Sequence, residues 1–139
     1  MADHPRKIIR QHVVGLLTGA IAAVGTRVFK TRTYAVQTAE VPAICVYTLR
    51  ETSEDLDLVG TLDRTVNLAL EIYARDREAP DDELDDLCQA VEDLMGADQT
   101  LGGTALDNRL AETLFGYDSE GRAVAGAARL RYAVRYQTS

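Results

Sequence analysis

The stretch TVNLALEIYARDREAPDDELDDLCQAVEDLMG, residues 65–96, changes its hydrophobic period from two residues to between three and four. Apolar residues alternate over 65–75, which predicts a half-buried strand. Pro80 stops the strand, and Asp81 or Asp82 is expected to cap a helix that ends at Gly96. The acidic first turn suits the positive end of the helix dipole. The predicted buried stripe of this helix is Leu84, Leu87, Cys88, Val91, Leu94 and Met95.

A second amphipathic helix is predicted at the N-terminal side, over residues 4–24. Asp3 precedes a proline in the first turn, and Gly25 stands where a C-terminal cap falls. Apolar residues recur at three- and four-residue steps between these limits, so this helix also has one face to bury.

Further strands surround these elements. Residues 26–51 are predicted to be extended, with a core strand over 43–49, and 51–61 to be an acidic loop. The glycine-rich segment 97–104 is expected to be a loop that packs poorly. Two long strands, about 106–117 and 122–137, then form a hairpin around 118–121. On the last strand Leu130, Tyr132, Val134 and Tyr136 share one face, and Arg129, Arg131, Ala133 and Arg135 the other.

The order of helix, strands, helix and hairpin predicts an α+β fold. We expect a mostly antiparallel sheet with two helices packed on one face and a long C-terminal β-hairpin. At 139 residues the chain suits one domain, residues 1–139.

Charge is unevenly distributed along the chain. Residues 1–50 carry seven basic and two acidic side chains, whereas 51–99 carry three basic and sixteen acidic ones. These opposite charges either neutralise each other within one subunit or join one copy to the next. The net charge of −7 argues against a specific nucleic-acid binder, because phosphate affinity needs clustered Lys and Arg.

The chain offers little for a cofactor or a membrane. Cys45 and Cys88 have no metal or redox spacing and fit small buried hydrophobes in a reducing compartment. The uncharged run 13–26 follows three basic residues and resembles a signal peptide, but it also fits the amphipathic helix and is too short to span a bilayer. We expect no cofactor and no membrane partner.

Catalytic groups are also scarce. His4 and His12 are two helical turns apart, whereas a shared metal typically takes histidines four residues apart. Asp82, Asp85 and Asp86 approach one another on a helix but lack a loop that would wrap a cation, so a solvated helix start is favoured over a metal site. No enzyme activity is predicted.

The arginines of the last strand allow three interpretations. They form the solvated face of a sheet, pair with acidic groups within the subunit or across a contact, or contact nucleic acid weakly. The tyrosines face away from the arginines, which disfavours the third interpretation, because stacking on bases needs both on one face.

Four pieces, in this order, resemble the phage tail terminator family, the minor tail protein U type of long-tailed bacteriophages. They are HPRKIIRQHVVGLL, VPAICVYTLRE, PDDELDDL and LFGYDSEG with the closing ARLRYAVRYQ, and they span nearly the whole chain. The resemblance implies a virion protein at the head-proximal end of the tail, assembled in the host cytoplasm. It implies a ring, commonly a hexamer, that caps the tail tube and presents the head-joining surface, with DNA free to pass through.

The partners implied are sister copies, the major tail tube protein and a head-completion or connector protein. Ring contacts are heterologous, so unlike patches of one subunit must complement each other. From charge and expected exposure, the interface residues predicted are Asp81, Asp82, Asp85 and Asp86 against Arg27, Lys30 and Arg32, with Asp55 and Asp57 of the 51–60 loop and Asp118 and Glu120 of the hairpin tip.

Three other functions stay open from the sequence. The chain could be another neck or tail completion protein, a small cytosolic enzyme whose site forms between subunits, or a secreted binding domain released after the first helix.

Overall fold

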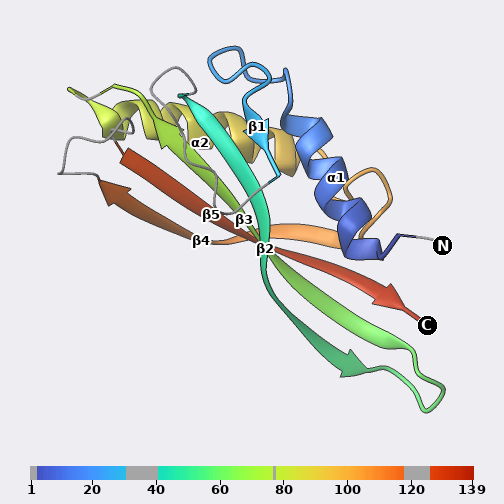
Figure 1. Ribbon diagram of the computed structural model, residues 1–139. Coiled ribbons are helices and arrows are strands. Elements are labelled where there is room, and N and C mark those ends of the chain that lie inside the picture. Colours follow the sequence, from blue (N-terminus) through green and yellow to red (C-terminus); the bar gives the residue numbers. More distant parts are fainter. Residues whose placement is uncertain (1–2, 31–40, 77, 118–125) are drawn as a thin grey trace.

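The computed structural model describes residues 3–30, 41–76, 78–117 and 126–139. Within these ranges the chain forms two helices and one five-stranded sheet (Figure 1). The elements in chain order are α1 (Pro5–Leu17), β1 (Val28–Phe29), β2 (Ala43–Asp55), β3 (Leu62–Ala74), α2 (Pro80–Gly96), β4 (Asp107–Tyr117) and β5 (Gly126–Thr138). The predicted α+β fold is confirmed.

The sheet has the strand order β1-β2-β3-β5-β4. The short strand β1 runs parallel to β2, and the other three pairings are antiparallel, as predicted for most of the sheet. Strand β5 lies between β3 and β4, and it pairs with β3 from Leu62↔Thr138 to Ala74↔Gly126. The strands predicted at 106–117 and 122–137 thus form the antiparallel pair β4–β5, and the turn expected at 118–121 lies outside the described residues.

One core cluster joins alternate residues of the central strands to the helices. The predicted face of β3 is fully buried, and the predicted apolar face of β5 is buried with it. The buried residues of both helices belong to the same cluster. They are Ile9, Val13 and Leu17 of α1 and Leu84, Leu87, Cys88, Val91 and Met95 of α2. Leu94 is only partly buried.

Helix α1 is shorter than the predicted 4–24. It ends at Leu17, where the Thr18 hydroxyl donates to the carbonyl of Val14 at 2.6 Å. The chain then turns, and the N–H of Gly19 bonds the carbonyl of Gly25 at 2.8 Å. Both glycines have positive φ, 76° and 60°, which suits residues without a side chain. The N-cap is His4, whose Nδ1 accepts from the Arg6 N–H, and not the expected Asp3.

The predicted acidic loop 51–61 is wrong in its first half. Strand β2 continues to Asp55 and pairs with β3 as far as Asp55↔Leu62, so only the residues between these strands form the turn. Backbone hydrogen bonds between two strands do not require apolar side chains, which explains why the acidic sequence still forms a ribbon.

The start of α2 also differs from the prediction. Ala79 is the N-cap and makes no side-chain capping bond, while Pro80 is the first helical residue. Asp81 and Asp82 therefore lie in the first turn, where their charge still favours the helix dipole.

Part of the glycine-rich segment after α2 packs against the core, whereas poor packing was expected. Leu101 is fully buried with φ 49°, and the Asp98 carboxylate accepts from the Gly102 N–H at 2.9 Å. A β-carbon at Gly102 would lie 2.5 Å from Cε1 of His12, so this segment approaches α1 closely.

Candidate interaction surfaces

The start of α2 forms an acidic surface. Asp81, Asp82, Asp85 and Asp86 are all exposed, as the sequence predicts for a solvated helix start. Glu83 instead turns back and its carboxylate accepts from the N–H of Arg75, which fixes the entry to the helix. This surface therefore presents exposed carboxylates, and no described loop wraps around them as a loop would around a bound cation.

The turn between β2 and β3, residues 56–61, forms a second acidic site with an apolar tip. Asp57 Oδ1 accepts from the N–H groups of Val59 and Thr61 at 2.9 and 3.1 Å, and its hydrogen bonds to Thr61 and Val59 lower the pKa of Asp57. Leu58 is 104% exposed and Val59 86%. The 51–60 loop was a predicted interface, with Asp55 and Asp57 as its named residues, and the apolar pair between Asp57 and Gly60 is the signal that could have singled out Leu58 and Val59.

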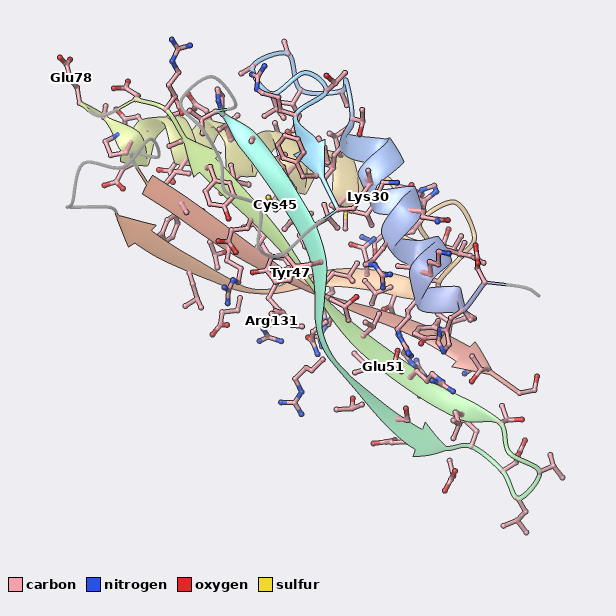
Figure 2. The ribbon with its side chains drawn as sticks, viewed as in Figure 1. Lys30, Cys45, Tyr47, Glu51, Glu78 and Arg131 are labelled. Carbon is pink, nitrogen blue, oxygen red and sulfur yellow. The ribbon has the colours of Figure 1, made fainter. Side chains whose placement is uncertain are left out.

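A basic hollow of about 270 Å³ lies beside α1. It is lined by Lys7, Arg10, Gln11 and Val14 of α1, by Lys30 after β1 and by Val46 of β2. Figure 2 shows Lys30 between α1 and β2. Of its lining residues, only Lys30 was a predicted interface residue. Three separate segments of the chain line the hollow, and their meeting could not be read from the sequence.

Arg27 is held within its own subunit. Its guanidinium donates to the carbonyls of Pro42 and Ala23, at 2.9 and 2.5 Å. The side chain therefore ties the segment after α1 to the start of β2. The predicted residues Arg32, Asp118 and Glu120 lie outside the described part of the chain.

The predicted interface residues do not converge on one site. The turn at 56–61 precedes β3 and α2 follows it, so the two acidic surfaces lie at opposite ends of this strand (Figure 1). A strand of 13 residues spans about 40 Å. The basic hollow lies between them, at Val46, whose partner in β3 is Leu70.

The arginines of β5 pair within the subunit. Arg135 binds Asp63 through two nitrogens, with a shortest distance of 2.8 Å, and Arg129 lies 3.4 Å from Glu71. Arg131 donates to the Asn67 side chain at 2.9 Å. It also lies 3.5 Å from Glu112, so of the three interpretations of this stripe, the one with acidic partners inside the subunit is confirmed for all three arginines.

A half-buried polar cluster anchors α1 to the sheet. The Glu51 carboxylate accepts from Arg6 Nη1 at 3.0 Å, from Arg64 Nη1 at 3.1 Å and from the hydroxyl of Tyr136. Burial and this bond to Glu51 raise the pKa of Tyr136. Partial burial and the nearby Arg6 lower the pKa of His4, which caps the same helix. The cluster is built from satisfied pairs and holds elements together.

The histidines also have structural partners. His12 Nε2 lies 2.6 Å from Asp98 Oδ2, and the hydrogen bonds from His12 and the Gly102 N–H lower the pKa of Asp98. This contact joins α1 to the segment after α2. Among the described residues, no group of three His, Cys, Asp or Glu side chains could hold a metal ion. No described helix is both long and apolar enough to cross a membrane.

Comparison with known proteins gives a family. The model of the phage minor tail protein U family matches residues 4–136 of the 139-residue chain. No curated protein matches the sequence significantly. The match includes both helices, β1 to β4, β5 as far as Tyr136, and all three surfaces described above. The chain belongs to the phage minor tail protein U family and is a structural protein of the phage tail.

Proposed function

We propose that this chain is a tail terminator. Copies of it, about six, form a ring on the last layer of the tail tube at the head-proximal end of the virion. The ring stops further polymerisation of the tube protein and presents the surface to which a head-completion protein binds.

The separation of charge on one subunit supports this proposal. Acidic carboxylates lie at the two ends of β3, and Lys7, Arg10 and Lys30 surround a hollow between them. A head-to-tail ring needs unlike, complementary patches on each copy. A subunit with an acidic surface and a separate basic surface meets this requirement without any bound substrate.

The acidic residues are assigned to contacts with other protein chains. We assign Asp81, Asp82, Asp85 and Asp86 of α2, and Asp55 and Asp57 of the β2–β3 turn, to surfaces that meet basic groups of sister copies or of the tube. Lys30 belongs to the basic surface. Arg27 is assigned a supporting role within its own subunit, because its guanidinium is bound to backbone carbonyls of its own chain.

Electron microscopy of tails tests the proposal. Tails assembled without this protein should be overlong and headless, and adding the purified protein to tubes should place a ring of about six copies at one end. A chain that stays monomeric within assembled virions would contradict the proposal. Binding to heads but never to tubes would instead identify another neck or completion protein.

A further inference from the structure

We propose that the apolar tip of the β2–β3 turn of one copy docks into the basic hollow beside α1 of the next copy. This inference rests on the proposed ring only for its biological setting. The contact itself follows from the shape and charge of two surfaces on the subunit.

The tip has the properties of a docking element. Leu58 and Val59 are almost completely exposed at the end of a paired ribbon, where a soluble protein gains nothing from apolar side chains. Asp57 fixes the turn through its two backbone hydrogen bonds, so little conformational entropy is lost on binding. Glu54 and Asp55 add negative charge beside the apolar pair, and both are exposed.

The hollow has complementary chemistry. Val14, which is half-buried, contributes apolar surface to it beside the buried Val46, and Lys7, Arg10 and Lys30 contribute positive charge. Arg10 is positioned by its bond to the Thr48 hydroxyl at 3.0 Å. An apolar pair flanked by carboxylates therefore matches an apolar recess flanked by cations.

One copy cannot make this contact with itself. Val46 lines the hollow, and nine further residues of β2 lead to Asp55, a distance of about 30 Å along an extended strand. Figure 1 shows the β2–β3 ribbon running out beyond both helices. The tip must therefore meet the hollow of another molecule. The tip and the hollow are different surfaces, so the contact is head-to-tail. It repeats from one copy to the next until the copies close into a ring.

Cross-linking in assembled tails tests the geometry directly. Val59→Cys at the tip and Gln11→Cys at the hollow place thiols on exposed positions, and a short bismaleimide then joins those that lie close together. The native Cys45 and Cys88 are buried, and burial raises the pKa of each thiol to about 11, so they react little. We expect the double variant to yield a ladder of cross-linked oligomers up to the ring.

Matched variants make the test specific. Tails built from a mixture of the two single variants should yield cross-linked dimers, and neither single variant alone should yield any. The pair Val59→Cys with Gln89→Cys, an exposed position on α2, is the control and should not cross-link. Dimers from Val59→Cys alone would reveal a symmetric contact and overturn the inference, as would a cross-link from Val59→Cys to the tube protein.

Charge exchange provides a second measurement. Lys30→Glu and Glu54→Lys should each lower ring occupancy on tube ends about tenfold, and the two together should restore it. Leu58→Ser should lower occupancy similarly while leaving the circular dichroism spectrum unchanged, because the side chain is fully exposed. Normal rings in all of these variants would overturn the tip contact and leave the terminator function standing, whereas wild-type protein absent from tube ends would refute that function.

Discussion

Glu51 joins α1 to the sheet through polar contacts. Its side chain is 14% exposed and compensates two guanidinium groups, Arg6 from α1 and Arg64 from β3. It also accepts a hydrogen bond from the hydroxyl of Tyr136 in β5. One carboxylate thus joins three elements that are far apart in the sequence.

Replacing this carboxylate should destabilise the fold. We expect Glu51→Gln to lower the free energy of unfolding by about 2 kcal/mol, because two partly buried cations lose their counter-charge. Urea denaturation measures the change. Glu112→Gln is the matched control, since Glu112 is 47% exposed and lies 3.5 Å from Arg131, and it should cost less than about 0.5 kcal/mol. Equal losses in the two variants would contradict the role assigned to Glu51.

The two buried thiols predict how stability depends on alkaline pH. Burial raises the pKa of Cys45 and of Cys88 from 9.0 to about 11. The unfolded chain therefore releases these protons first, so their contribution is complete below pH 9 and is lost as pH rises through 11. The loss should be on the order of 2 kcal/mol per thiol at pH 11. Urea denaturation between pH 8 and 11 measures it. In the double variant Cys45→Ala, Cys88→Ala, the free energy of unfolding should depend less on pH over this range.

At the scale of elements, the end of α2 depends on one buried side chain from β4. Asn108 is 2% exposed, and its Nδ2 donates to the carbonyls of Asp98 and Gln99 at 3.0 and 3.1 Å. It also lies 3.4 Å from the carbonyl of Met95. Met95 lies in the last turn of α2, and Asp98 and Gln99 follow the helix, so this amide ties β4 to the end of α2 and the turn after it.

Asn108→Ala should cost about 1–3 kcal/mol of unfolding free energy, because it removes a buried amide that donates to the carbonyls of Asp98 and Gln99. Asn108→Asp has nearly the same shape but turns an acceptor toward these carbonyls, so at neutral pH it should be less stable than the alanine variant. Thermal unfolding compares the two. An aspartate variant as stable as wild type would show that the amide donor contributes nothing.

The sequence predicted those elements in which apolar residues recur at a regular spacing and form the buried face. The burial of β3, the alternation of β5 and the stripe of α2 all follow from apolar residues at fixed steps. The end of α1 was missed because Ile21 and Val24 keep the helical period and are buried, although the backbone turns after Leu17. The second half of β2 was missed because its pairing with β3 is made by backbone groups.

The candidate surfaces were predicted less well for a different reason. Acidic residues of α2 could be assigned to the surface because charge at a helix start is solvated. The hollow could not be predicted, since α1, the residues after β1 and the middle of β2 meet only once the sheet is formed. The exposure of Leu58 depends on how far the paired strands β2 and β3 extend. The sequence predicted a loop over 51–61, so this extension was not expected.

At the scale of the whole molecule, the acidic start of α2 is expected to act in assembly and not in folding. Reversing charge with Asp85→Lys and Asp86→Lys should leave the far-ultraviolet circular dichroism and the unfolding midpoint nearly unchanged, because both side chains are exposed. Tails assembled with this variant should be overlong or headless in electron micrographs. Gln89→Lys adds positive charge to the same helix and serves as the control. Tails of normal length from the double variant would refute a role for this surface.

The position of β5 between β3 and β4 also has a consequence during synthesis. The ribosome produces β4 before β5, so β4 has no described neighbour to join until the strand that separates it from β3 has emerged. A polypeptide interrupted before Gly126 would leave β3 with an open margin along its whole length and β4 detached, a state prone to aggregation.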